Sequence, residues 1–260
     1  FAQGTPYRLL GVLAWDRHLV GGDAPARLYL LGADSRGRDL FSRLLFGARV
    51  SLSIGLVGVF VSFAIGLLVG GMAGYFSGWV DDILMRACEM VMMVPGFYLL
   101  LALRAAFPPE MSSVQVYVLI VLIMSFIGWA GLARVIRGLA LSVRERGFIV
   151  AARACGRSHL GIIVAHIVPN TASYAIVAAT LSIPGYILGE TALSLLGLGI
   201  QDPHASWGNL LSDAMAIVHL QLHPWSLWPG AWIILTVMAY NFLGDGLRDA
   251  FDPRLEQDTR

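Results

Sequence analysis

The sequence predicts an all-α membrane protein with about five transmembrane helices. Of its 260 residues, 57% are hydrophobic and 13% are charged, and the mean hydropathy is +0.71. Soluble domains carry about 25% charged residues. Several apolar blocks approach the roughly 20 residues that a helix needs to cross a bilayer. One polar interval in mid-chain has helical periodicity, so we expect an ordered element between two spans.

The composition also excludes several functions. The chain contains no lysine, so it cannot form a Walker A loop, which places a lysine on the nucleotide phosphates. Its net charge of +1 gives no electrostatic footprint for nucleic acid. Cys88 and Cys155 fall in no paired pattern, and we expect reduced thiols. The sequence therefore predicts no nucleotide hydrolysis by this chain itself.

Residues 1–46 contain no apolar run long enough for a span, and we interpret them as an extracytoplasmic lead-in segment. A transmembrane domain is predicted at 47–250, and its first span lies near 49–75. Glycine recurs at every fourth position of this span, which lets another helix approach closely. We expect this strip to serve helix packing and not substrate binding. The strip consists of Gly66, Gly70, Gly74 and Gly78.

Two further spans are predicted near 83–107 and 114–134. Pro95 and Gly96 should kink the earlier of the two near its middle. Arg104 lies close to the end of that span, where a long charged side chain can reach the membrane interface.

The mid-chain interval, residues 144–170, has the pattern of two short helices joined at a glycine. Ala151, Ala152 and Ala154 favour helix, and Gly156 would end that helix as C-terminal glycines do. Connecting loops seldom carry such signals. We therefore interpret the interval as a surface that a soluble partner grips.

A second helical pattern follows that glycine. Leu160, Ile163 and Ile167 should lie on one apolar face of it. Pro169 then stops the helix and redirects the chain into the next apolar block.

The fourth span is predicted near 171–198, with Pro184 and Gly185 breaking it in mid-membrane. Glu190 follows a turn and a half later. An ionisable residue at such a depth is costly and faces a partner or a water path. Two interpretations stay open: Glu190 lines a translocation path, or it ties a neighbouring helix through hydrogen bonds.

Residues 200–228 form a polar, tryptophan-rich extracytoplasmic segment. A fifth span is predicted near 229–247, and a charged cytoplasmic tail at 251–260. His219 and His223 stand four residues apart, a spacing that can bind metal on a helix. Neither a cysteine nor a glutamate base accompanies them, and a proline follows at once, so we predict no metal site.

The placement of arginine predicts the orientation in the membrane. Residues 134–157 hold six arginines, whereas residues 107–113 and 201–228 hold none. Because arginine-rich loops stay on the cytoplasmic side, we expect the interval 144–170 in the cytoplasm. Five spans then place residues 1–46 outside, although that segment also carries arginines, many of them balanced by acids.

Several stretches of this sequence match one known family pattern. The pattern is roughly Glu-Ala-Ala, three residues, Gly, then about nine residues to hydrophobic–His–hydrophobic–hydrophobic–Pro–Asn. The matching positions here are Ala151, Ala152, Gly156, His166, Pro169 and Asn170. Further matches are GADSRGRDLFSRLLFGARVSL, ETALSLLGLGIQDPHASWGNLL and NFLGDGLRDAFDPR. Over residues 31–254 the chain resembles the second permease subunit of bacterial ABC importers of the dipeptide, oligopeptide and nickel class.

The resemblance implies a type I ABC importer permease fold, in which one more N-terminal span usually precedes this region. It implies that residues 144–170 form a cytoplasmic coupling loop, with Val150 departing from the family Glu. Some of the expected site residues follow from the resemblance, and others follow from the helical patterns. Those of the coupling loop are Glu145, Ile149, Val150, Ala151, Ala152, Arg153, Gly156, Arg157, Leu160, His166 and Pro169. The candidate for the translocation path is Glu190.

The resemblance also implies the partners and the location. A homologous permease subunit would complete the translocation path, and an extracytoplasmic solute-binding protein would deliver peptides or a related small solute, including a nickel chelate. Two ATPase subunits would use ATP and magnesium, and this chain would bind no cofactor. The location implied is the inner membrane of a bacterium, in contact with lipid.

A competing interpretation is a secondary transporter or channel that acts without ATPase partners. Such proteins carry intramembrane charges or inverted repeats of broken helices. Here the candidate charges are Glu89, Arg104 and Glu190, and no internal repeat is visible. An intramembrane hydrolase is not supported, because no H-E-x-x-H motif and no convincing Ser/His pair lies within the spans.

Overall fold

The described part of the chain is almost entirely helical. Within it, four helices are long and apolar enough to cross a membrane, or five if one bent helix pair counts as a single span. The prediction of an all-α membrane protein with about five spans is confirmed. The computed structural model describes residues 2–9, 13–18, 29–108, 110–215 and 217–251, with the backbone alone at 2–9, 13–18 and 217–219.

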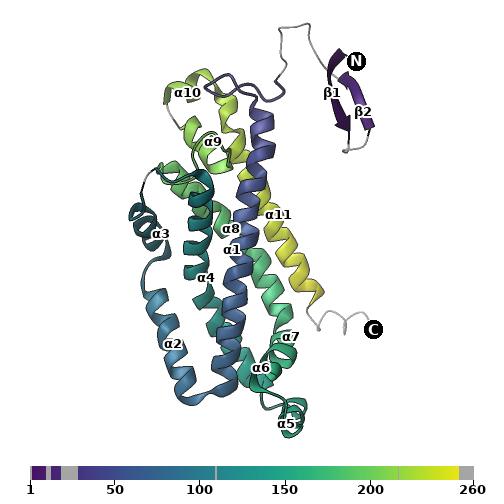
Figure 1. Ribbon diagram of the computed structural model, residues 1–260, viewed down its shortest axis with the longest axis vertical. Coiled ribbons are helices and arrows are strands. Elements are labelled where there is room, and N and C mark those ends of the chain that lie inside the picture. Colours follow the sequence, from purple (N-terminus) through teal and green to yellow (C-terminus); the bar gives the residue numbers. More distant parts are fainter. Residues whose placement is uncertain (1, 10–12, 19–28, 109, 216, 252–260) are drawn as a thin grey trace.

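A short hairpin at the N-terminus departs from the all-helical prediction. Strands β1 (Ala2–Leu9) and β2 (Leu13–His18) pair antiparallel, and the register is irregular between Gln3 and Tyr7. The hairpin belongs to the segment that was predicted to hold no span, and it lies outside the helical bundle (Figure 1).

Helix α1 (Leu40–Phe76) runs the length of the bundle beside α4 (Ser113–Val143), as Figure 1 shows. Along the glycine strip the two backbones nearly touch. A Cβ added at Gly70 would lie 2.4 Å from the carbonyl oxygen of Ala133. The prediction that this strip serves helix packing is therefore confirmed for Gly66, Gly70 and Gly74.

The second predicted span is two helices, α2 (Gly78–Met93) and α3 (Gly96–Ala105), bent by 77° at their junction. The expected kink is thus a full break. Val94 takes an extended conformation with φ −87° and ψ 124°, because the ring of Pro95 disfavours helical backbone in the residue before it.

Arginine contacts hold these two helices in the bundle. Arg137 of α4 donates hydrogen bonds through both Nε and Nη2 to the carboxylate of Asp81 in α2. Arg104 of α3 is buried and donates to the carbonyl oxygen of Leu198 at 2.8 Å, a contact that the sequence did not predict. Gly78 was expected in the glycine strip, but it begins α2 at φ 61° with open space around it.

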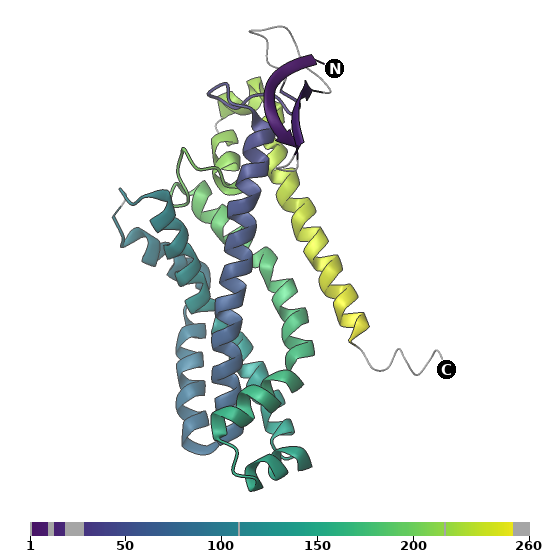
Figure 2. The ribbon, with the colours of Figure 1, turned by 45° about the vertical axis from the view of Figure 1, so that its right-hand side comes forward.

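The fourth span, α8 (Ala172–Leu195), continues through Pro184 without a break, which corrects the predicted mid-membrane interruption. Neighbouring helices support such prolines within a membrane, because they restrain the backbone around the missing hydrogen bond. The last span, α11 (Trp228–Ala250), packs along α8 and diverges from it toward its C-terminal end (Figure 2).

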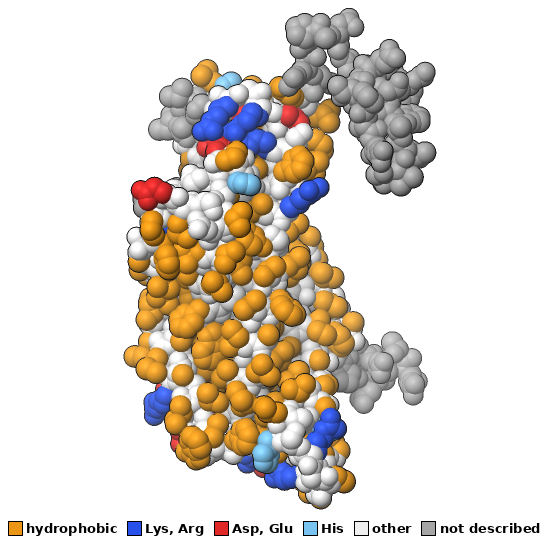
Figure 3. Space-filling view, in the orientation of Figure 1, with side chains coloured by type: hydrophobic (Ala, Val, Ile, Leu, Met, Phe, Trp, Pro, Cys, Tyr) orange, Lys and Arg blue, Asp and Glu red, His pale blue; other side chains and the backbone are white. Residues whose placement is uncertain are grey.

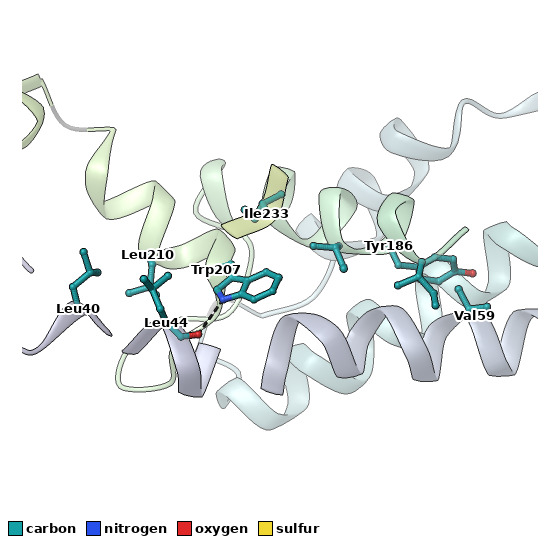
Figure 4. Close-up of a cluster of buried hydrophobic side chains, with 9 residues drawn as sticks. Leu40, Leu44, Val59, Tyr186, Trp207, Leu210 and Ile233 are labelled. Carbon is teal, nitrogen blue, oxygen red and sulfur yellow. Dashed lines mark hydrogen bonds between the residues drawn. The ribbon is translucent and has the colours of Figure 1, made fainter. Parts of the chain in front are cut away.

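Three short elements close the end of the bundle that carries residues 29–39, which we call the lead-in end. They are α9 (Trp207–Ala214), α10 (Ile217–Leu222) and the 3₁₀ turn η2 (Pro224–Leu227). Trp207, in the predicted tryptophan-rich segment, is buried and donates from Nε1 to the carbonyl oxygen of Leu44 at 3.0 Å (Figure 4). The cluster around it contains Leu40, Leu44, Val59, Ile183, Tyr186, Ile187, Leu210 and Ile233.

The surface of the bundle is a broad apolar band with charged side chains gathered at its two ends (Figure 3). Large apolar side chains point outward along this band, among them Phe60, which is 75% exposed, and Phe242, which is 69% exposed. Helices that are apolar on outward faces as well as inward faces are typical of membrane spans. The distribution of charge therefore agrees with the predicted transmembrane domain.

We predict that Gly70→Ala separates α1 from α4 and lowers the free energy of unfolding by about 1 to 3 kcal/mol, because the added methyl group meets backbone that cannot move aside. Gly131→Ala in α4 is the matched control, since nothing lies within 4 Å of its Cβ position. Thermal unfolding in detergent measures both, and equal melting temperatures for the two variants would contradict the prediction.

Candidate functional site

The mid-chain interval 144–170, here named the coupling loop, lies at the end of the bundle opposite the lead-in end (Figure 1). We call this the loop end. The interval contains a short helix, a corner, and a second helical segment with one π turn. The elements are α5 (Gly147–Ala154), α6 (His159–Ile162), the π-helical η1 (Ile163–Ile167) and α7 (Val168–Asn170).

The corner between the two helices has a fixed geometry. Gly156 takes φ 75°, a conformation that residues with a side chain rarely adopt. Its N–H donates to the carbonyl oxygen of Arg153 at 3.0 Å, and the N–H of Arg157 donates to that of Ala152 at 3.1 Å. This pair of bonds is the Schellman pattern that ends helices. Ser158 then caps α6 through its hydroxyl, so no free hinge separates the two helices.

Isoleucines anchor the coupling loop to the bundle. Ile149, Ile162, Ile163 and Ile167 are fully buried, and they pack with Tyr75 of α1 and with residues of α4. Ile149 was expected to contact a partner, and its burial shows that it does not lie on the outer surface.

Leu160 does not share the buried face with Ile163 and Ile167, as the sequence pattern had suggested. It is 61% exposed, and Ile162 takes its place in the core. Leu160 lies in the four-residue helix α6, ahead of the π turn at Ile163–Ile167 that interrupts the 3.6-residue period assumed from the sequence.

The outward face of the coupling loop exposes large apolar side chains beside the exposed arginines Arg146, Arg153 and Arg157. Val150 and Leu160 are 56% and 61% exposed, and their predicted contact with a partner stays a prediction. Phe148 and Val164 are also exposed, at 42% and 55%, and sequence reasoning missed both. Large apolar residues in a segment whose isoleucines already fill the core were the signal that could have found them.

The structure brings some of the remaining predicted residues together. The guanidinium of Arg157 donates to Nε2 of His166 at 3.3 Å, and the rings of His166 and Phe148 lie 6.2 Å apart. Glu145 lies 3.8 Å from Arg144 at the exposed start of the loop. Ala151 and Pro169 are exposed, and Ala152 is half-buried against the isoleucine cluster.

Glu190 is fully buried near the lead-in end of α8. Its Oε1 accepts hydrogen bonds from the hydroxyl of Ser194 at 2.7 Å and from that of Ser206 at 2.8 Å. Ser206 also caps α9, so the carboxyl group joins α8 to α9. In this conformation the geometry is that of a tie between helices, and the alternative role on a translocation path stays a prediction.

A groove of about 400 Å³ lies between α3, α4 and α8. Its walls are apolar side chains and glycines, with Ser182 and Tyr186 as polar members. Gly185 faces open space there, while Glu190 is not among the lining residues.

Comparison with known proteins places the chain in a family. The sequence pattern described as "Binding-protein-dependent transport system inner membrane component" matches residues 66–257. The chain belongs to this family of transport permeases. The permease resemblance and the inner-membrane location that the sequence suggested are thereby confirmed.

Curated relatives support the same assignment. The permease is 41% identical to the oligopeptide transport system permease protein OppC of Haemophilus influenzae, over 87% of this chain and 70% of the relative. It is 38% identical to the dipeptide transport system permease protein DppC of Bacillus subtilis, over 90% and 71%. It is 40% identical to the glutathione transport system permease protein GsiD of Escherichia coli O6:K15:H31, over 90% and 75%.

Solved structures support the fold. The permease superposes on a chain of the MetNI methionine ABC transporter in an inward-facing conformation with a TM-score of 0.61, at 17% identity, over 81% of this chain and 97% of that one. It superposes on a chain of an amino acid ABC transporter with a TM-score of 0.56, at 14% identity, over 81% and 95%. The predicted ABC importer permease fold is confirmed.

An ion-pair network holds the lead-in end of the permease together. Arg43 of α1 donates to Asp34 at 2.6 Å and to Asp202 at 2.7 Å, and Arg38 bonds both acids as well. Arg36 adds a further ion pair to Asp202. The network joins the lead-in segment, the start of α1 and the connection between α8 and α9. The arginines and acids of the lead-in segment therefore make structural contacts.

Burial of Asp34 disfavours its charged form, but hydrogen bonds outweigh that effect. The backbone N–H groups of Arg38 and Arg36 and the side chains of Arg43 and Arg38 lower its pKa from 3.8 to about 2. For Asp202, burial again acts in the opposite direction, and the neighbouring arginines lower the pKa. Both carboxylates stay ionised over the physiological pH range.

The structure bears differently on several other predicted features. The side chain of His219 and residues 252–260 of the predicted tail lie outside the described residues. Trp225 donates from Nε1 to the carbonyl oxygen of Ala33 at 2.9 Å, which adds a contact to the lead-in segment. Among the described residues there is no group of three or more His, Cys, Asp or Glu that could hold a metal ion.

Substitutions at Glu190 distinguish its two roles. Glu190→Ala should lower the free energy of unfolding by about 2 to 3 kcal/mol, because it leaves buried serine hydroxyls without their acceptor and opens a cavity. Glu190→Gln keeps an acceptor oxygen and should unfold close to wild type. Thermal unfolding in detergent tests both. Unchanged stability in Glu190→Ala, together with altered transport in both variants, would favour the path role.

The ion-pair network should weaken in acid. The folded pKa of Asp34 lies below its unfolded value, so its stabilising contribution is complete above about pH 4 and is lost as the pH falls toward 2. We expect the melting temperature of wild type to exceed that of Asp34→Asn at pH 6. At pH 2.5 this difference should shrink, and a difference that stays constant between the two pH values would refute the assignment.

Proposed function

We propose that this permease pairs with a homologous subunit and imports peptides or a related small solute, driven by two separate ATPase subunits that grip the coupling loop. The observation that carries the proposal is the loop itself, which is rigid at its corner, anchored by buried isoleucines, and exposes several large apolar side chains on its outer face. Peptide substrates are inferred from the names of the oligopeptide and dipeptide relatives.

The outer face of the loop supplies the contact with an ATPase. Phe148, Val150, Leu160 and Val164 are exposed, and they lie in the loop between the spans α4 and α8. Burial of each such side chain in a partner groove contributes about 1.5 to 3 kcal/mol. Val150 replaces the family glutamate, so the contact at this position is apolar.

Rigidity of the loop turns ATPase closure into movement of the spans. ATP and magnesium act on the partner subunits, and the ATPase pair must bind the loop differently in its open and closed forms, since equal binding would shift no equilibrium. The Schellman bonds at Gly156 transmit such a displacement from α5 to α6 without bending.

The groove between α3, α4 and α8 is proposed as the contribution of this subunit to the path. Its glycines and Ser182 offer a smooth wall, and none of its lining residues is charged. A peptide could pass such a wall with little dependence on the charge of its side chains. The lead-in end, with residues 200–228, would face an extracytoplasmic solute-binding protein.

Two alternatives remain as experimental outcomes. A nickel substrate would enter as a chelate, because the described residues offer no metal-binding cluster. A secondary transporter or channel would work without ATPase subunits, and import by the permease pair alone in liposomes would identify it.

Co-purification tests the ATPase contact. Leu160→Asp places a charge on the apolar outer face, and we expect at least tenfold weaker recovery of ATPase subunits, because the buried carboxylate would have no partner. Leu222→Asp is the matched control, since Leu222 is also exposed, at 64%, but lies at the lead-in end. Equal recovery of ATPase subunits by wild type and Leu160→Asp would refute the proposed contact.

A further inference from the structure

We propose that Tyr75, at the loop end of α1, fastens the coupling loop to α1, so that a displacement of the loop moves the α1–α4 pair. This inference rests on the proposed function. The chain itself joins the loop to α4 and to α8, whereas α1 has no peptide connection to it. Non-covalent contacts must therefore carry any movement to α1, and Tyr75 is the positioning residue that supplies them.

One ring contacts both helices of the loop. The hydroxyl of Tyr75 lies 2.9 Å from Nδ1 of His159, the first residue of α6. The guanidinium carbon of Arg153, in α5, lies 5.2 Å from the centroid of the same ring. These two residues lie on opposite sides of the corner at Gly156, so Tyr75 contacts the chain both before and after the corner.

The tyrosine is itself held firmly. It is 4% exposed and belongs to the cluster of isoleucines that anchors the loop, beside Ala140 and Val143 of α4. Its neighbour Phe76 also contacts His159, with ring centroids 5.4 Å apart. A shift of α6 therefore meets the end of α1 directly.

The polar contacts of Tyr75 depend on direction, unlike the apolar packing around it. Apolar contacts hold the loop against α1, but they have no preferred direction. A hydrogen bond requires a narrow range of distance and angle, and a cation above a ring requires alignment with its face. Tyr75 makes both contacts, and it therefore fixes the orientation of the loop as well as its proximity.

Packing contacts connect the coupling loop to the membrane-spanning helices α1 and α4. Ile163 of the loop packs against α1 at Gly71, where an added Cβ would lie 3.1 Å from its Cγ2 atom. The glycine strip then joins α1 to α4 by backbone contact. The loop, α1 and α4 thus form one mechanical unit, while α11 contacts other parts of the bundle.

The test uses the assembled complex of both permease subunits and the ATPases in liposomes, with import of a radiolabelled peptide measured per ATP hydrolysed. Tyr75→Phe keeps the ring and removes the hydroxyl. We expect threefold to tenfold lower import per ATP, the range that loss of one hydrogen bond gives. Recovery of ATPase subunits and the rate of ATP hydrolysis should stay at wild-type values. A variant that was merely misfolded would lower both.

Tyr174→Phe is the matched control. Tyr174 is 43% exposed near the loop end of α8, and its loss of a hydroxyl should leave import per ATP unchanged. His159→Phe keeps an aromatic ring and removes the other half of the hydrogen bond. The double variant Tyr75→Phe with His159→Phe should lose no more than either single variant, because both remove the same interaction.

Three results would overturn the inference. They are wild-type import per ATP in Tyr75→Phe, losses that multiply in the double variant, and a fall in assembled complex that accounts for the loss of import. A wild-type permease that recovers no ATPase subunits would overturn the proposed function and this inference together. If wild type imports peptide in step with ATP hydrolysis and Tyr75→Phe has the same import per ATP, this inference alone is overturned.

Discussion

Backbone contact between α1 and α4 is the constraint on which the rest of the bundle depends. In a membrane, lipid tails are as apolar as the side chains, so helices gain little by hiding apolar surface from their surroundings. Close approach is needed for attraction, and the glycines at positions 66, 70 and 74 allow it. The other spans then pack around this pair: α2 through the Asp81–Arg137 contact, and α8 through the cluster that includes Tyr186.

The two ends of the bundle are stabilised by different physical means. The lead-in end relies on charge, with Asp34 and Asp202 surrounded by arginines, and on Glu190 with its serines. The loop end relies on buried isoleucines, on the contacts of Tyr75 with His159 and Arg153, and on the ion pair between Asp81 and Arg137. An end that must respond to a partner benefits from an anchor that keeps its shape while its outer face stays apolar. The lead-in end, held by ion pairs, can keep the spans aligned with one another while the loop end moves.

The coupling loop gains its stiffness from local bonds and its placement from the bundle. Gly156 supplies the backbone conformation, and Ser158 caps the next helix, so the corner keeps its angle. The isoleucines then decide which face turns inward. As a result Val150 and Leu160 point outward, where an ATPase of the proposed complex would meet them.

The sequence by itself determined the number and the type of spans, the helix–glycine–helix form of the coupling loop and the packing role of the glycine strip. These features depend on local backbone chemistry and on the length of apolar blocks, which a sequence displays directly. It could also indicate that Val150 lies on the outer surface.

Only the tertiary structure decided which residues face which neighbour. The break at Pro95 and the continuous helix at Pro184 follow from the same residue type, and packing around each site made the difference. The burial of Ile149 and the exposure of Leu160 depend on how the coupling loop packs against α1 and α4, which no sequence period displays. Contacts such as Arg43 with Asp202 and Tyr75 with His159 join residues far apart in the chain, so they exist only once the helices have assembled.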